Sequence, residues 1–321
     1  MSSSRIFYID ALKAFAIVLV VMGHMSHLWT NENSQSIYLP ILSAFHMPLF
    51  MALSGYVTNV DTFKIAKKAK LLIPFFVFGL AWTAYQQLPL LGFFEHEAKA
   101  GYWFLYVLFM FFVFLSLIRA TKQNPYIGMG IIQVVLMGLH FLFHRTIPGT
   151  TLSTDHMFQL WPFFCYGIIL RKGILNICYS HKFISLIICL LGIILMLGVQ
   201  FTLHLTSTLL IYSNDLMSLY IVPLLFILFH EAERRLKGKN NKIKSIVKFL
   251  GHQIGINTLQ IYVLQYFVIH VFTLFFGEFC KSYLAECELI FSPILGIILC
   301  LICVLVSELM HKLKLGFVFG R

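Results

Sequence analysis

The first long apolar segment, FYIDALKAFAIVLVVMGHMSHLW, carries three ionisable residues, Asp10, Lys13 and His24. A histidine can take the proton from a hydroxyl, and a nearby ammonium group can stabilise a developing negative charge. Lys13 and His24 are 11 residues apart, which is three helical turns plus about 20°. We therefore expect both on one helix face, with Asp10 close to it. The structural alternative is an ion pair between Asp10 and Lys13 and a histidine bonded to a backbone carbonyl.

A second polar group lies in the next apolar segment, FHMPLFMALSGY. His46 is a candidate hydrogen-bond donor, proton relay or second base, although a lone histidine in such a segment is often only a packing residue. Pro48 removes a backbone hydrogen bond and predicts a kink. Ser54 and Gly55 allow a neighbouring backbone to approach closely. Tyr56 is a candidate for shaping the path of a substrate.

Two later segments add polar side chains. Trp103 opens the apolar run GYWFLYVLF, where an aromatic residue either anchors the membrane interface or lines a substrate path. The segment LGHQIGINTLQIYVLQYF has an unusually polar face made of Asn257, Thr258, Gln260, Tyr262 and Gln265. These side chains either hold helices together or line a cavity.

The composition indicates the element that must position these residues, a bundle of membrane helices. The chain has 321 residues, of which 59% are hydrophobic and only 12% charged. Soluble domains carry about 25% charged residues. We therefore expect an all-α, polytopic integral membrane protein built as one domain over residues 1–321. No segment predicts a soluble domain that could bind nucleic acid.

Windows of about 20 apolar residues predict ten membrane spans. They are placed at residues 7–29, 37–58, 71–93, 102–119, 126–144, 156–171, 183–203, 213–231, 250–277 and 288–311. With the N-terminus in the cytoplasm, ten spans return the C-terminus to the same side.

The positive charges support this orientation. Of the 24 Lys and Arg residues, 20 fall in segments expected inside, three fall outside and Lys13 lies within the first span. Cytoplasmic loops carry the excess of Lys and Arg in membrane proteins. The charge also suits contacts with anionic lipid headgroups or with the phosphates of a cytoplasmic nucleotide substrate.

The seven cysteines show no spacing typical of metal ligands, so no metal is expected from them. Cys280 and Cys287 fall in the expected outer loop 278–287 and could form a disulfide on an oxidising side.

Six motifs resemble, in order, the acyltransferase-3 family of membrane acyltransferases, and within it the branch similar to fucose 4-O-acetylase. They are RIFYIDALKAFAIVLVVMGH, FHMPLFMALSGY, KKAKLLIPF, GYWFLYVLF, PFFCYGIILRK and LGHQIGINTLQIYVLQYF. The first two together are the most specific. In the first motif, the family's functional histidine corresponds to His24 and its basic partner to Lys13.

The resemblance implies a ten-helix enzyme of a bacterial cytoplasmic membrane, multi-pass and without a bound cofactor. It would transfer an acyl group, usually acetyl, from cytoplasmic acyl-CoA to a hydroxyl of a surface polysaccharide, lipid-linked sugar or related envelope molecule. Two positions depart from the family pattern. Many relatives have arginine at the position of Lys13, and the last motif often ends in histidine where this chain has Gln265, which cannot act as a base.

These observations predict a membrane O-acyltransferase with His24 as general base and Lys13 as support for the donor or the oxyanion. Asp10 would hold Lys13, and His46 would relay a proton. Tyr56, Trp103 and Tyr262 would shape the acceptor path. Direct transfer and a transient acyl-histidine at His24 both remain open. The competing classes are a transporter or exporter of envelope precursors and a membrane sensor or scaffold.

Overall fold

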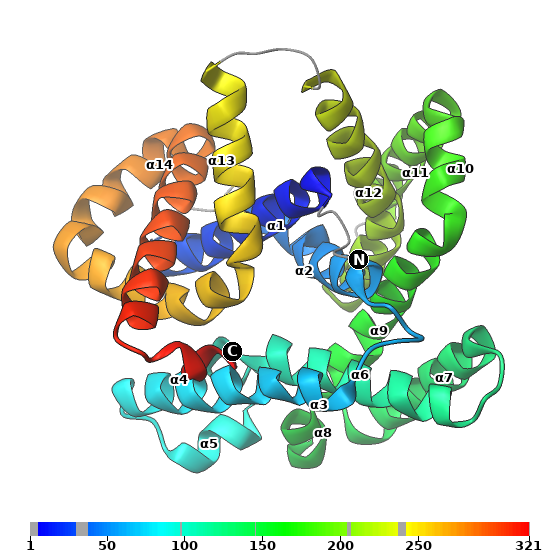
Figure 1. Ribbon diagram of the computed structural model, residues 1–321, viewed down its shortest axis with the longest axis horizontal. Coiled ribbons are helices and arrows are strands. Elements are labelled where there is room, and N and C mark those ends of the chain that lie inside the picture. Colours follow the sequence, from blue (N-terminus) through cyan, green and yellow to red (C-terminus); the bar gives the residue numbers. More distant parts are fainter. Residues whose placement is uncertain are drawn as a thin grey trace. The chain divides into compact units, whose positions relative to one another are not determined.

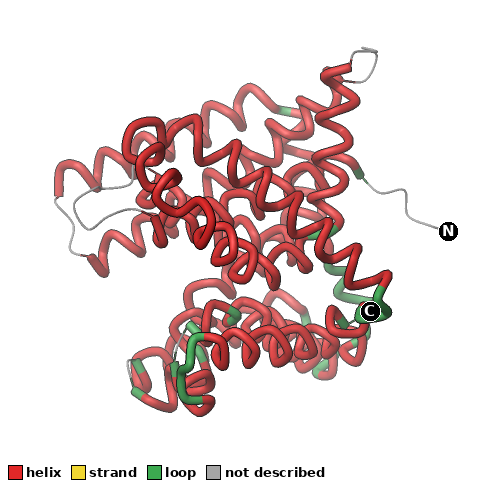
Figure 2. Tube along the Cα trace, turned by 90° about the vertical axis from the view of Figure 1, so that its left-hand side faces the viewer, coloured by secondary structure: helices red, strands yellow, loops and turns green. Residues whose placement is uncertain are grey.

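The computed structural model describes residues 6–29, 38–96, 98–144, 146–203, 207–236 and 242–320, without the side chains of 38–41, 207–208, 242–244 and 281–287. Within these ranges every regular element is a helix and no strand occurs (Figure 2). The all-α prediction is therefore confirmed.

In the part of the chain that the structure describes, eighteen helical elements follow one another (Figure 1). They are α1 (Phe7–Trp29), α2 (Tyr38–Val57), α3 (Ile65–Lys68), η1 (Ala69–Leu71), α4 (Leu72–Tyr85), α5 (Leu90–Glu95), η2 (Lys99–Gly101), α6 (Trp103–Ala120), α7 (Pro125–Phe143), α8 (Ile147–Leu152), α9 (Thr154–Ile169), η3 (Leu170–Ile174), α10 (Leu175–Ser180), α11 (Lys182–Leu203), α12 (Ser207–Leu236), α13 (Lys242–Ile256), α14 (Thr258–Lys312) and η4 (Gly316–Phe319).

The helices form two compact units. Unit 1 comprises Met1–Leu53 and Ile169–Val306, and unit 2 comprises Ser54–Ile168 and Ser307–Arg321. Unit 1 therefore holds α1, most of α2 and the helices from α10 to most of α14. Unit 2 holds α3 to α9 and the C-terminal η4.

Seven helical stretches among the described residues are long and apolar enough to cross a membrane. They are Phe7–Trp29, Trp103–Ala120, Pro125–Phe143, Lys182–Leu203, Leu209–Leu236, Thr258–Cys280 and Glu288–Lys312. The predicted spans at 37–58, 71–93 and 156–171 correspond to α2, α4 and α9. Helix α2 has 20 residues, of which Leu42–Val57 have described side chains, whereas α4 has 14 residues and α9 has 16. A multi-pass helical protein is thus confirmed, whereas the count of ten spans stays a prediction.

The expected span at 71–93 is wrong in its second half. Helix α4 ends at Tyr85, and Gln87 adopts a positive φ of 57°. The Leu88 N–H then bonds back to the Thr83 carbonyl at 3.1 Å, which closes the turn before α5. Pro89 precedes α5 and lacks the N–H that a continuous helix would require.

The last two expected spans are also divided differently. The window 250–277 is broken at Asn257, between α13 and α14. Conversely, the expected loop 278–287 is helical, so that α14 continues through it to Lys312. Figure 1 shows α14 bending back on itself, so one helical element forms two limbs, here defined as residues 258–280 and 288–312.

Helix α1 packs chiefly against α13 in unit 1, and also contacts both limbs of α14. A Cβ atom at Gly255 would overlap the carbonyl oxygen of Asp10, so the two backbones meet directly. Further along, Trp29 Nε1 donates to Thr273 Oγ1 at 2.7 Å. The two pairs are 245 and 244 residues apart in sequence, so α13 and then the first limb follow α1 in the same direction over residues 10–29, a length of about 28 Å.

The second limb of α14 runs antiparallel to α1. Gly296 lies against Met22, and the Ser26 hydroxyl donates to Glu288 Oε1 at 3.5 Å. As residue numbers rise on α1 they fall on this limb. The predicted ninth and tenth spans therefore cross in opposite directions, as expected, although no loop separates them.

Helices α11 and α12 of unit 1 pair in the same antiparallel way. Lys182 Nζ lies 3.4 Å from Glu231 Oε1 at one end. At the other end, Gln200 Nε2 donates to Ser213 Oγ at 3.0 Å and to Asn214 Oδ1 at 2.9 Å. The start of α1 joins the first of these ends, since the Tyr8 N–H donates to Glu233 at 3.1 Å.

In unit 2 the basic segment around α3 is fixed to α6. Arg119 donates to the carbonyls of Asp61 and Phe63 at 3.4 and 2.9 Å, and its guanidinium lies over the Phe63 ring. Lys68 Nζ lies 4.2 Å from the centre of the Phe112 ring. Burial against this ring lowers the pKa of Lys68 below its usual value.

The direct backbone contact at Gly255 yields a first prediction. Gly255→Ala should lower the midpoint of thermal unfolding in detergent, by the equivalent of about 1–3 kcal/mol, because the added methyl group has no space. The matched control is Gly198→Ala on α11, where a Cβ would meet no atom within 4 Å. The control should be neutral or slightly stabilising, because alanine favours the helix. Equal melting temperatures for the two variants would contradict the close packing.

Candidate active site

The centre of the candidate site is a contact between His24 and Tyr266. The Tyr266 hydroxyl and His24 Nε2 are 3.0 Å apart, and the two ring centres are 4.7 Å apart. His24 comes from α1 and Tyr266 from the first limb of α14. Along α1, His24 lies between Asp10 and Trp29, as Tyr266 lies between Gly255 and Thr273, so the pair agrees with the parallel direction of these segments.

Two further histidines lie near this pair. His46 on α2 and His27 on α1 both interact electrostatically with His24. His46 Nδ1 bonds to the Leu42 carbonyl of its own helix, which fixes its ring. His27 is exposed, whereas His24 and His46 are half-buried. The structure thus brings the predicted residues His24 and His46 together in unit 1.

Lys13 and Asp10 form the predicted ion pair, with Lys13 Nζ 3.8 Å from Asp10 Oδ1. The other carboxylate oxygen lies 3.7 Å from His252 Nδ1 on α13. Asp10 is buried, and Lys13 keeps a quarter of its side chain exposed. Asp10 therefore lies close to Lys13 on its own helix and to His252 on α13. It lies about four turns before His24 on α1.

The polar side chains expected around residue 260 are present, and they differ in their hydrogen bonds. Asn257 marks the break before α14, and its side-chain amide donates to the Gln253 carbonyl at 2.9 Å. Tyr262 is buried, and its carbonyl accepts from Gln265 Nε2 at 3.1 Å. Gln265 is fully buried, and its Oε1 has no hydrogen-bond partner among the described residues. That oxygen is a free acceptor one residue before Tyr266.

The remaining predicted site residues belong to unit 2. Trp103 stacks on His156 with ring centres 4.0 Å apart, an arrangement the sequence did not reveal. Ser54 and Tyr56 lie at the end of α2, next to Gly55, where a Cβ would overlap the Phe164 carbonyl. The close approach expected at Gly55 is therefore confirmed, while the roles of Ser54, Tyr56 and Trp103 stay predictions.

Sequence reasoning missed Tyr266 and His252 as partners of the first helix. Both lie in the motif LGHQIGINTLQIYVLQYF, so the signal was present, but their contacts span 242 residues and depend on the register of two helices. Cys280 is a buried free thiol, and the side chain of Cys287 lies outside the described residues, so their pairing stays a prediction.

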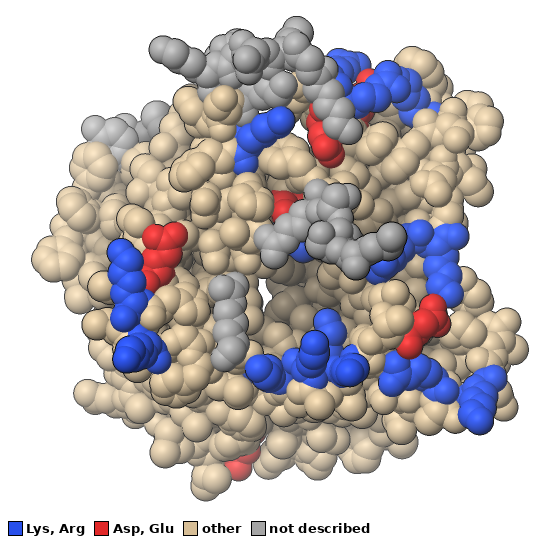
Figure 3. Space-filling model, in the orientation of Figure 1, with Lys and Arg blue, Asp and Glu red and all other residues tan. Residues whose placement is uncertain are grey.

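Basic side chains gather on one exposed surface of unit 2. Figure 3 shows Lys and Arg over α3, in the lower centre of the view. This group contains Lys64, Lys67 and Lys70, all exposed, beside the half-buried Lys68.

Comparison with known families gives a match over nearly the whole chain. A family model described as an acyltransferase domain, Acyl_transf_3, matches residues 6–310. The chain belongs to the acyltransferase-3 family. The matched region contains the His24–Tyr266 pair, the ion pair at Asp10 and both units. No solved structure matches.

Two curated relatives carry the name nodulation protein NolL. The protein of Sinorhizobium fredii is 27% identical over 217 residues, which cover 59% of this chain and 56% of the relative. The protein of Mesorhizobium japonicum is 26% identical over 226 residues, which cover 60% of this chain and 57% of the relative. The chain thus matches little more than half the length of each.

Gln265 yields the second prediction. A buried acceptor without a partner costs about 1–3 kcal/mol, so Gln265→Met should leave thermal stability unchanged or raise it. The control Gln200→Met removes two hydrogen bonds between α11 and α12 and should destabilise the protein. Thermal unfolding in detergent measures both. A loss of stability for Gln265→Met as large as that of the control would show that its Oε1 has a structural partner.

Proposed function

We propose that the protein is a membrane O-acyltransferase, most simply an O-acetyltransferase of the fucose 4-O-acetylase-like branch. It would transfer an acyl group from cytoplasmic acyl-CoA to a hydroxyl of a surface polysaccharide or lipid-linked sugar. The observation that carries the proposal is the His24–Tyr266 contact, within a chain that belongs to an acyltransferase family. The single domain would cover residues 1–321 and sit in a bacterial cytoplasmic membrane.

In this proposal His24 is the general base, and Tyr266 fixes its tautomer. If His24 Nε2–H donates to the Tyr266 oxygen, the lone pair of the ring remains on Nδ1. Nδ1 can then accept the proton of the sugar hydroxyl as that oxygen attacks the thioester carbonyl. Collapse of the tetrahedral intermediate expels the CoA thiolate, which takes up the proton. The reaction needs no bound cofactor or metal, with acyl-CoA as co-substrate.

Lys13 would support the donor from the cytoplasmic half of α1. At about 1.5 Å per residue, Lys13 lies about 16 Å from His24 along the helix, too far to contact the same carbonyl. The distance favours a role with the distal part of the donor over a role in stabilising the oxyanion. Asp10 and His252 would hold the Lys13 side chain in place.

The proposed orientation places both termini, the basic η3 and the basic ends of α12 and α13 in the cytoplasm. It is supported by the packing of unit 1, where the start of α1, the start of α11 and the end of α12 lie together. His24 then lies in the outer half of α1, near the face where the acceptor would bind. In this proposal, His46 would relay the proton away from His24.

The third prediction tests the base. His24→Ala should lower transfer of labelled acetyl groups from acetyl-CoA into envelope glycans by about 10²–10⁴-fold, the usual contribution of a general base. Tyr266→Phe should lower it by about 10–100-fold, because a hydrogen bond to a charged group contributes about 1.5–3 kcal/mol. Membranes with equal amounts of each protein are compared.

The matched control is His27→Ala, which removes an exposed histidine from the same helix one turn later. It should retain activity within about twofold, since surface substitutions rarely disturb a fold by more than about 0.5 kcal/mol. Loss of activity in His27→Ala comparable to that in His24→Ala would contradict the assignment. Activity that persists in His24→Ala would move the search for the base to His46.

A fourth prediction concerns direction. In sealed inside-out vesicles, acetyl-CoA added outside should acetylate an acceptor enclosed in the lumen. In the same vesicles, Lys13→Ala should raise the KM for acetyl-CoA more than it lowers kcat, because Lys13 would bind the donor. Right-side-out vesicles given external acetyl-CoA are the control and should remain inactive. Product formed only on the face exposed to acetyl-CoA would contradict transfer across the membrane.

A further inference from the structure

A cluster of three possible metal ligands, none of which was used above, lies in unit 2. His140 and His144 are four residues apart at the end of α7, so their side chains share one helix face. Asp155 lies in the first turn of α9, where a carboxylate is favoured by the helix dipole. The intervening α8 is a short helix that returns the chain to this point.

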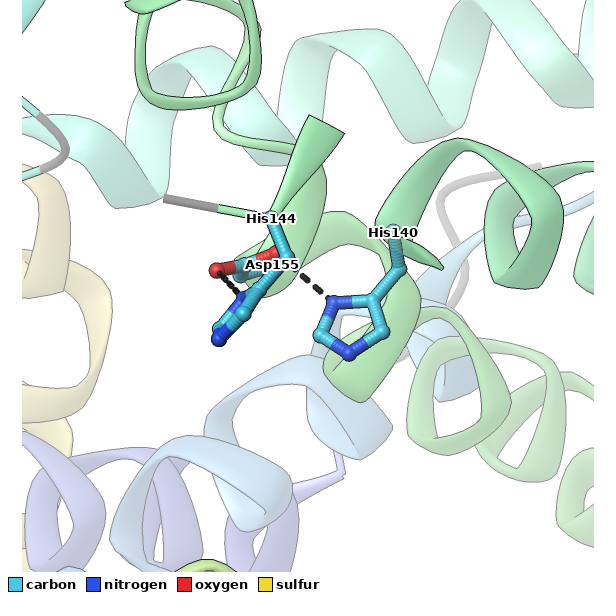
Figure 4. A group of neighbouring side chains, drawn as sticks. All are labelled: His140, His144 and Asp155. Carbon is cyan, nitrogen blue, oxygen red and sulfur yellow. Dashed lines mark hydrogen bonds and ion pairs between the residues drawn. The ribbon is translucent and has the colours of Figure 1, made fainter. Parts of the chain in front are cut away.

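The three side chains converge on one another, as Figure 4 shows. His140 Nδ1 lies 2.7 Å from one carboxylate oxygen of Asp155, and His144 Nδ1 lies 2.7 Å from the other. One ligand atom from each residue lies within 4.8 Å of the other two. Both imidazoles therefore present the same ring nitrogen to a single carboxylate.

The surroundings hold part of the cluster in place and leave part of it open. The His140 ring stacks on Phe158, with ring centres 4.7 Å apart and planes 18° apart, and its side chain is 12% exposed. His144 is 45% exposed and Asp155 is 23% exposed. A dissolved ion can therefore reach a site in which one ligand is already oriented by packing.

We propose that His140, His144 and Asp155 bind a divalent transition-metal ion, with Zn²⁺ as the best match. Two imidazoles and one carboxylate are ligands of this class of metal. Ligands of tetrahedral zinc are about 3.3–3.6 Å apart, given metal–ligand distances of about 2.0–2.2 Å. The present separations of 2.7 Å reach that range when each side chain moves outward by less than about 1 Å.

To bind the metal through Nδ1, a neutral ring must carry its single proton on Nε2 instead of Nδ1, and a ring in the imidazolium form releases its Nδ1 proton to solvent. Three protein ligands leave one position for water on the exposed side. The ion would connect the end of α7 to the start of α9. It would stabilise unit 2, because it would bind the folded chain and not the unfolded chain. The cluster contains no cysteine, so the cysteine spacing could not have indicated it.

The test uses the full-length, tag-free protein in detergent, stripped of metal with a chelator and titrated with Co²⁺. We expect saturable visible d–d absorption at one ion per chain, without the thiolate charge-transfer band that binding to cysteine would produce. Zn²⁺ should abolish the absorption and raise the melting temperature. His144→Ala and Asp155→Asn should each weaken binding by at least about tenfold.

The control is His181→Ala, which removes an exposed histidine of unit 1 and should bind Co²⁺ like the unaltered protein. His144 is itself largely exposed, so His144→Ala should fold normally, as size-exclusion chromatography would show. The proposal is overturned if the folded wild-type protein gives no saturable absorption. It is also overturned if His144→Ala binds Co²⁺ as tightly as His181→Ala, since the three residues would then be only a hydrogen-bonded group.

Discussion

The direct contact between the backbones of α1 and α13 sets the geometry on which the candidate site depends. Gly255 has no side chain to keep the two helices apart, and one turn earlier a Cβ at Gly251 would lie 3.4 Å from the Ala11 methyl group, in ordinary contact. After the break at Asn257, the first limb of α14 runs along α1 in the same direction, which brings Tyr266 to His24. No local sequence signal predicts this contact.

The same packing explains how ionisable groups are tolerated in an apolar bundle. Asp10 is buried but lies near Lys13 and His252, and His24 has a tyrosine hydroxyl as partner. Such groups are costly in hydrocarbon unless the protein provides partners. Gln265 differs from these residues, because its buried Oε1 has no hydrogen-bond partner among the described residues. That oxygen is costly in the free protein and would be satisfied by a polar group that reached it.

The sequence predicted the helical membrane class, the bounds of α1 and the pairing of Asp10 with Lys13, because each depends on hydrophobicity or on spacing within one helix. The prediction failed where long-range packing or a backbone turn determines where a helix ends or continues. The examples are Gln87, Asn257 and the helical stretch 278–287. Tyr266 escaped notice for the same reason. His140 and His144 have a recognisable spacing, but only the fold brings Asp155 to them.

The contact between His24 and Tyr266 restricts how α14 can change in length between its start and Tyr266. Each inserted residue turns the rest of a helix by about 100° and advances it by about 1.5 Å. One residue added between Thr258 and Tyr266 would therefore point the tyrosine away from His24. Family members of different length are expected to differ outside this part of α14.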